Sequence, residues 1–193
     1  ASCDKIVPGM LMAAARLDIP AIMITGGPTL GGVVFDGRKT DETSLHEALG
    51  MLTAGRITEE EFRSLENLCA PTCGSCSFFG TANTMCCLAE VLGMALPGSA
   101  LVPAVYSERF RLACETGERI CRMAREGLTA RKILNGLSIE NAVRATLAMS
   151  GSTNAVMHLA AIAAEAEAGV DVMDLFSRLG PETPQIVRVN PAS

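Results

Sequence analysis

The chain has 193 residues, of which 49% are hydrophobic and 19% are charged. This length suits one domain with a sizeable core, and the composition excludes a disordered chain. The formal net charge is −5, with no Trp and one Tyr, which argues against binding to phosphate backbones or stacked bases. No apolar run reaches the roughly 18 residues of a spanning helix, and the sequence does not open with a signal-peptide pattern. We therefore expect neither nucleic acid nor membrane as a partner.

The order of apolar positions, caps and glycines predicts a helix-rich chain. Two short apolar runs, Ile19–Thr25 and Gln185–Val189, are expected to be strands. The fold class predicted from these elements is α/β: a three-layer α/β/α unit with a small, mainly parallel sheet, as one domain over residues 1–193. In chain order, helices are expected from Pro8 to Leu17, over 43–54, after a capping box at Thr58–Glu61, over 80–95 and 107–126, after caps at Thr129 and Ser138, from Gly151–Asn154 to about 168, and after a cap at Asp171.

Eight cysteines are an unusual number for a chain of this size without a secretory pattern. We interpret them as thiols of a reducing compartment, the cytoplasm, rather than as a disulfide framework. The cysteines that fall in predicted helices are expected to be buried apolar thiols: Cys86, Cys87, Cys114 and Cys121. Both histidines, His46 and His158, are expected to fill packing positions within helices rather than to bind a metal.

Cys69, Cys73 and Cys76 lie within eight residues, beside Pro71 and Gly74. Three thiols in such a loop suit a soft metal centre. Their spacing is also that of radical S-adenosylmethionine enzymes, which would use all three and leave Cys3 dispensable. A structural zinc site with a fourth ligand, or unligated thiols in a tight turn, are further alternatives.

The tripeptide Cys3-Asp4-Lys5 places a soft and a hard metal ligand at adjacent positions. A carbamate on the Lys5 amine would turn this cation into an oxygen donor suited to Mg²⁺. The alternative is an ordinary polar surface.

A second polar group, Gly151–Asn154 at a predicted helix start, offers N–H groups and hydroxyls to a carboxylate or phosphate. N-capping explains that group equally well.

Three blocks of sequence, separated along the chain, carry recognisable motifs. The blocks are Ser2–Leu17 with Ile19–Ile22 and Gly26–Pro28; Pro71–Ser77 with Gly80–Met85 and Glu90–Gly98; and Glu140–Ala142 with Ser150–Leu159 and the closing Val189–Ser193. Together they resemble the dihydroxy-acid dehydratase and phosphogluconate dehydratase family, over the central part of its N-terminal domain.

The resemblance implies an iron–sulfur, Mg²⁺-dependent hydro-lyase that converts 2,3-dihydroxy carboxylic acids into 2-oxo acids. Cys3 and Cys76 match two of the three cluster cysteines, and Cys73 is expected to be an accessory residue of the same site. Asp4 matches a Mg²⁺ ligand, and Lys5 matches the carbamylated lysine of the catalytic site. The cluster is expected to be [4Fe-4S] or [2Fe-2S].

The family resemblance also implies a class of substrate and a longer parent protein. Pro71–Ser77 is closest to members that act on branched-chain dihydroxy acids, for valine and isoleucine biosynthesis, whereas Phe79–Asn83 leans toward sugar-acid dehydratases. Ser152 and Thr153 are expected to bind the substrate. Relatives are about three times longer and work as dimers, so we expect a fragment of a larger homodimeric protein, inactive alone, lacking an upstream segment and a C-terminal β-barrel-like domain. The remaining alternative is a truncated chain that serves only in assembly.

Overall fold

The structure is a computed structural model that describes residues 2–187. Within this range the chain forms nine helices and one two-stranded antiparallel sheet. In chain order the elements are α1 (Ile6–Leu17), β1 (Val34–Phe35), β2 (Arg38–Lys39), α2 (Glu42–Thr53), α3 (Glu59–Leu68), α4 (Thr81–Val91), α5 (Glu108–Glu126), α6 (Ala130–Ile133), α7 (Gly136–Ala148), α8 (Asn154–Glu165) and α9 (Val172–Leu179).

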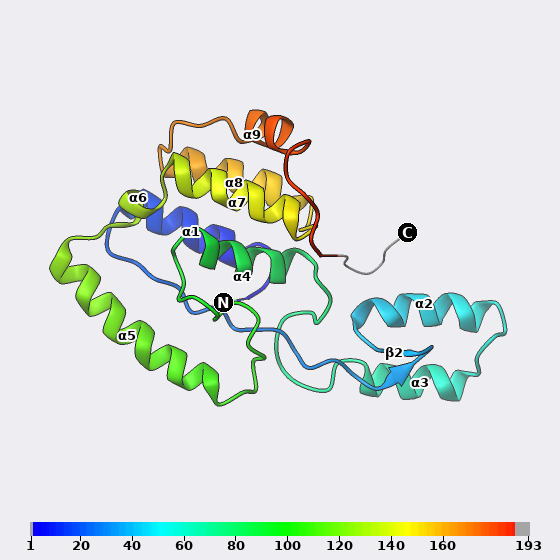
Figure 1. Cartoon of the computed structure of the whole chain (residues 1–193). Helices are drawn as coiled ribbons and strands as arrows, with labels where there is room; N and C mark the ends of the chain where they lie inside the picture. The colour runs from blue at the N-terminus through cyan, green and yellow to red at the C-terminus, as the bar shows by residue number, and fades with distance from the viewer. Residues whose placement is uncertain (1, 188–193) are drawn as a thin grey trace.

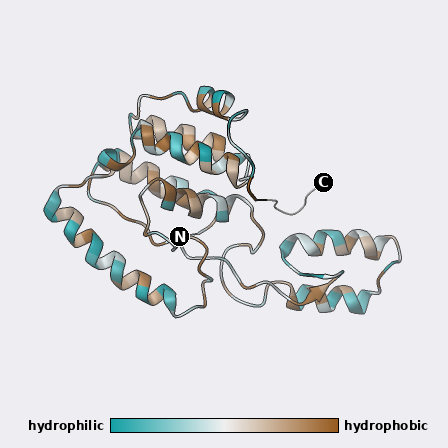
Figure 2. Ribbon diagram, in the orientation of Figure 1, coloured by the Kyte–Doolittle hydropathy of each residue, from teal (hydrophilic) through white to brown (hydrophobic). Residues whose placement is uncertain are grey.

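The core lies between five helices that pack directly on one another. α8 contacts α1, α4, α7 and α9, and α4 also contacts α1 and α7. Figure 1 shows these helices as one group, with α5 at its side and with α2, α3 and the β1–β2 hairpin as a separate arm. Leu11, Leu88, Ile139 and Leu159 are fully buried in the group, and burial of each contributes about 1.5–3 kcal/mol. In Figure 2 the hydrophobic colour concentrates on this group, while α5 is largely hydrophilic.

Most predicted helices are confirmed, and their ends follow the expected local signals. Thr58 caps α3 and Glu61 reaches back to its backbone N–H, which completes a capping box. Asp171 accepts hydrogen bonds from two backbone N–H groups at the start of α9. The prediction that Ser138 caps a helix is wrong. Asn135 is the cap of α7, and Ser138 occupies the third helical position, where its hydroxyl accepts a bond from the Asn135 N–H.

The helix-rich α/β class is confirmed, but the sheet differs from the expected one. In the range that the structure describes, the sheet is the antiparallel β1–β2 hairpin, and the helices of the packed group touch without a sheet layer between them. Over residues 2–187, parallel pairing is limited to two isolated bridges, Met23 with Ala95 and Pro28 with Ser75.

Among the described residues, the segment Ile19–Thr25 carries an isolated bridge at Met23 and is not a regular strand. Pro20 has no N–H to donate to a ladder, and the apolar character of the segment is explained by burial of Met23 against the core. Of the expected terminal strand at Gln185–Val189, residues 185–187 are irregular, and residues 188 and 189 lie outside the described range.

Candidate functional site

Asp4 and Lys5 lie at the start of α1, where Lys5 is the N-cap residue. The Lys5 ammonium donates a hydrogen bond to Oδ2 of Asp4, and 73% of the Lys5 side chain is exposed. The other carboxylate oxygen of Asp4, Oδ1, is buried and has no hydrogen-bond partner among the described residues. The two oxygens of one carboxylate therefore face different surroundings, one toward Lys5 and solvent and the other toward the protein interior.

The interior side of Asp4 faces α4 and α8. Nε2 of His158, on α8, lies 3.8 Å from Oδ1 of Asp4. The pKa of Asp4 is lowered, chiefly by the hydrogen bond from Lys5, and further by the charges of Lys5 and His158 and by the hydroxyl of Thr81. Because Thr81 is the first residue of α4, the starts of α1 and α4 and the first half of α8 meet around this carboxylate.

Ser152 belongs to the same group of side chains. Its hydroxyl lies 2.8 Å from that of Thr81, and its backbone N–H donates to the Thr84 hydroxyl at 3.1 Å. Asn154 donates to the Thr81 hydroxyl at 3.1 Å. Thr153 is exposed and is the N-cap residue of α8, without a side-chain capping bond. The structure thus brings Ser152 to the Asp4 region, with Thr153 next to it at the helix start.

The three helix N-termini that meet around Asp4 favour an anion. The first turns of α1, α4 and α8 contain no acidic residue. The partial positive charges at these helix N-termini are therefore not compensated within the helices. Backbone N–H groups at such ends bind carboxylates and phosphates.

Cys76 lies in a loop that is fixed from two sides. The N–H of the preceding residue, Ser75, donates to the Gly27 carbonyl at 3.0 Å. On the other side, the side-chain amide of Asn83, 2% exposed on α4, donates to the carbonyls of Cys76 and Phe78, both at 2.8 Å. Asn83 is a positioning residue that sequence reasoning missed, although it stands inside the quoted Gly80–Met85 motif.

The Cys76 thiol is half-buried and close to other acidic groups. Its pKa is raised first by burial and then by the negative charge of Glu42. The residues before the two thiols lie against the same turn: a Cβ at Gly26 would lie 2.6 Å from Oγ of Ser2, and the neighbouring Gly27 carbonyl accepts from Ser75. Cys3, which is exposed, is thereby brought into the region of Cys76, although 73 positions separate them in the sequence. Glu42 accepts a hydrogen bond from the Ser77 N–H at 3.0 Å and so ties the α2 arm to this loop.

The other two thiols of the loop have different surroundings. Cys69 is buried at the end of α3, and burial raises its pKa. Cys73 is exposed, and its accessory role stays a prediction. Among residues 2–187 no group of three or more His, Cys, Asp and Glu side chains is arranged to hold a metal ion. The side chains that we consider as donors to a cofactor are the Cys3 and Cys76 thiols and, next to Cys3 in sequence, Asp4 and Lys5.

The cysteines in helices divide into two kinds. Cys86 and Cys87 on α4 are buried, and burial raises the pKa of Cys87 to about 12. The prediction of burial is wrong for Cys114 and Cys121, which are exposed on α5. Their separation of seven residues does place them on one face of α5, but that face is exposed to solvent.

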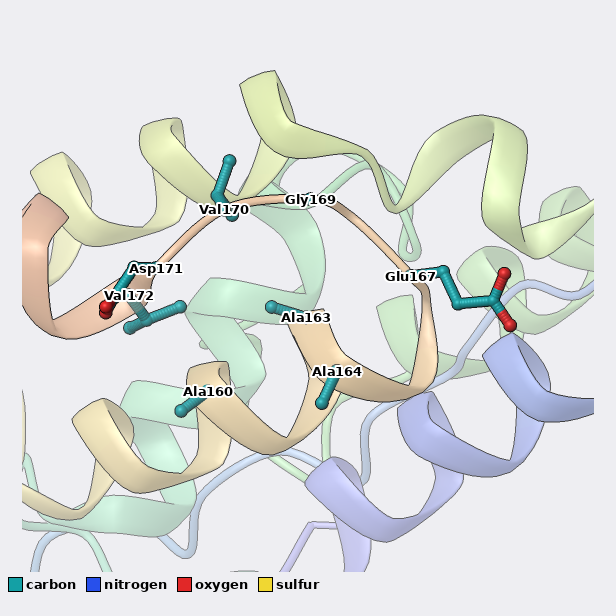
Figure 3. A pocket seen from close by; sticks show the side chains of 8 residues that line it. All are labelled: Ala160, Ala163, Ala164, Glu167, Gly169, Val170, Asp171 and Val172. Carbon is teal, nitrogen blue, oxygen red and sulfur yellow. The ribbon is translucent and has the colours of Figure 1, made fainter.

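A hollow at the other end of α8 contains none of the predicted site residues. Figure 3 shows it between the last turns of α8 and the segment that leads into α9, with mostly small side chains around it. Its two acidic residues already have partners, since Glu167 pairs with Arg131 and Asp171 caps α9.

Across the described residues, no helix is both long enough and apolar enough to cross a bilayer.

Comparison with known proteins identifies the class of protein to which this site belongs. Residues 1–193 match the family described as "Dihydroxy-acid/6-phosphogluconate dehydratase N-terminal". The chain therefore belongs to the dihydroxy-acid/6-phosphogluconate dehydratase family, within its N-terminal domain. The radical S-adenosylmethionine interpretation of the three-cysteine loop is not supported by this family.

Individual relatives are similar over nearly the whole chain. A dihydroxy-acid dehydratase of Caldanaerobacter subterraneus subsp. tengcongensis is 52% identical over 192 residues, which cover 99% of this chain and 34% of the relative. Another from Clostridium pasteurianum is 54% identical, with 88% of this chain and 59% of the relative covered. A third, from Pyrococcus abyssi, is 48% identical over all of this chain and 34% of the relative. The chain thus spans about a third of the length of two of these relatives.

Proposed function

We propose that this chain forms part of an iron–sulfur, Mg²⁺-dependent hydro-lyase that dehydrates 2,3-dihydroxy carboxylic acids to 2-oxo acids. The observation that carries the proposal is twofold: Asp4 lies beside His158 on α8, and the residues before Cys3 and Cys76 both lie against the Gly26–Gly27 turn. Relatives named dihydroxy-acid dehydratase, about half identical to this chain, support a substrate of that class.

The donor chemistry suits both inorganic groups. Cysteine sulfur, which Cys3 and Cys76 offer, is the preferred ligand of iron–sulfur clusters, and oxygen donors such as the Asp4 carboxylate are preferred by Mg²⁺. When bound, the iron–sulfur cluster and Mg²⁺ would act as Lewis acids that assist departure of the C3 hydroxyl and removal of the C2 proton. Lys5 is largely exposed, so its ammonium can lose a proton to solvent and the resulting amine can add CO₂. The carbamate forms with loss of a second proton and adds two oxygen donors beside Asp4.

The residues of the chain would bind and orient the substrate. A carboxylate group would be held by the Ser152 and Thr153 end of α8 and by the Thr81 end of α4, where N–H groups and hydroxyls are available and the first turn of each helix contains no acidic residue. Loss of water from C2–H and C3–OH then gives an enol that relaxes to the 2-oxo acid. We assign no general base among residues 2–187.

The favoured substrate is a branched-chain dihydroxy acid of valine and isoleucine biosynthesis, and the second candidate is a sugar acid such as gluconate or phosphogluconate. The first is favoured because the similar relatives carry the name dihydroxy-acid dehydratase. We place the protein in the cytoplasm, because its eight cysteines are unpaired and a reducing compartment keeps them so. We also propose that the protein is a homodimer and that it binds neither nucleic acid nor a membrane.

The test uses the protein with the sequence that naturally flanks residues 1–193. After anaerobic reconstitution with iron, sulfide and Mg²⁺, 2-oxo acid formation is measured with dihydroxyisovalerate, gluconate and 6-phosphogluconate. We expect the highest kcat/KM with dihydroxyisovalerate. A higher value with a sugar acid would select the second candidate, and no product from any of the three acids would contradict the proposed function.

A further inference from the structure

The contact between His158 and Asp4 leaves two buried polar atoms unsatisfied. Nε2 of His158 and Oδ1 of Asp4 are both inaccessible to solvent, and neither has a hydrogen-bond partner among the described residues. The two atoms lie 3.8 Å apart, about 1 Å beyond a normal hydrogen bond. A buried polar atom without a partner costs about 1–3 kcal/mol. A shift of about 1 Å that joins these atoms removes both penalties.

The burial of His158 is not explained by packing alone. The residue is 7% exposed and lies on α8, which packs directly against α1. An apolar side chain would fill the same space without leaving an unpaired nitrogen. The other histidine of the chain, His46, is exposed on α2, and its ring lies 3.2 Å from a carbonyl one turn earlier.

We propose that His158 is a positioning residue for Asp4: its Nε2–H donates to Oδ1 and holds the carboxylate so that Oδ2 faces Lys5. This inference rests on the proposed function, in which Asp4 is a Mg²⁺ ligand. Oδ2 is already on the side of the Lys5 ammonium. Oδ1 therefore anchors the carboxylate to His158, and Oδ2 is left to bind the metal ion. Groups that hydrogen-bond to metal ligands in this way commonly change metal affinity 10–100-fold when they are replaced.

The decisive comparison is between two replacements of His158 in the protein with its natural flanking sequence. His158→Gln keeps an N–H donor at similar reach, whereas His158→Leu keeps the bulk and removes the donor. Binding of Mn²⁺, used as a probe for Mg²⁺, is measured by electron paramagnetic resonance of the free ion, at fixed iron content. His46→Leu is the matched control.

We expect Mn²⁺ affinity to fall at least 10-fold in His158→Leu and to stay within threefold of wild type in His158→Gln and His46→Leu. A smaller fall in His158→Leu, or an equal fall in both His158 variants, overturns the positioning role. If His158→Leu does not fold, as judged by circular dichroism, His158→Asn replaces it, because its amide is too short to reach Oδ1. The same criteria then apply to that variant.

A further variant separates this inference from the proposed function. Asp4→Asn removes the ligand charge and should abolish Mn²⁺ binding. If wild type and Asp4→Asn bind Mn²⁺ equally, the proposed metal role of Asp4 fails. If Asp4→Asn abolishes binding while His158→Leu does not weaken it, only the role of His158 fails.

Discussion

Replacement of Arg109 is expected to destabilise the protein strongly, because its guanidinium joins two loops inside the molecule. Arg109 is 8% exposed on the first turn of α5. It donates to the Thr25 carbonyl at 2.7 Å and to the Val102 carbonyl at 2.8 Å. In Arg109→Met the alkyl chain is retained and these carbonyls lose their donors. At about 1–3 kcal/mol for each unsatisfied acceptor, the loss is about 2–6 kcal/mol.

The measurement is urea unfolding followed by circular dichroism, with linear extrapolation. For an m-value of about 2 kcal/mol/M, the midpoint should fall by about 1–3 M. Arg122→Met is the matched control, because Arg122 is exposed on the same helix, and its effect should stay within about 0.5 kcal/mol. A loss below about 1 kcal/mol in Arg109→Met would refute the reasoning from unsatisfied carbonyls.

Three further predictions concern thiols, a glycine and a helix cap. Burial raises the pKa of Cys87 to about 12. Since the thiolate is the nucleophile, Cys87 should resist iodoacetamide from pH 7 to 10 while exposed Cys114 reacts, as mass spectrometry would show; equal rates would contradict this. Gly74 has φ +144° and a Cβ there would meet the Thr29 backbone at 2.2 Å, so Gly74→Ala should lower Tm more than Gly37→Ala, where φ is also positive but no atom lies within 4 Å. Thr58→Ala removes a cap and should cost about 1 kcal/mol in urea unfolding, and no loss would argue against that cap.

The features that sequence alone could predict are those whose physical cause lies within a few residues. Thr58 and Glu61 are three positions apart, and both partners of their capping box were visible. Gly127 ends α5 in the left-handed conformation, φ +63°, which glycine adopts at low cost. Such signals need no knowledge of the rest of the fold.

Features that depend on distant partners could not be predicted in the same way. Ile19–Thr25 is apolar enough for a strand, but a strand needs a neighbour along its length, and in the described part of the chain the bridge at Met23 is isolated. The spacing of Cys114 and Cys121 correctly indicates a shared face of α5. Whether that face is covered depends on what packs against the helix, and this information is absent from the spacing.

In the candidate site, too, some residues belong to motifs that the sequence shows and others depend on distant partners. The family was predicted from motifs that include Cys3, Asp4 and Cys76, and the match over residues 1–193 confirms it. The roles of these three residues stay predictions. Asn83 and His158 were missed as positioning residues. The contact of His158 with Asp4 joins residues 154 positions apart, and neither helical spacing nor composition carries a signal for such a pair.

The central claim is that Cys3 and Cys76 hold the same iron–sulfur cluster. The most direct measurement is the iron content of Cys3→Ala, Cys76→Ala and Cys69→Ala after anaerobic reconstitution of the protein with its natural flanking sequence. Cys69 is the matched control, since it belongs to the same cysteine-rich loop but is 3% exposed at the end of α3. We predict that Cys3→Ala and Cys76→Ala each lose most of the iron and that Cys69→Ala retains it. Wild-type iron content in Cys3→Ala or in Cys76→Ala would contradict the claim.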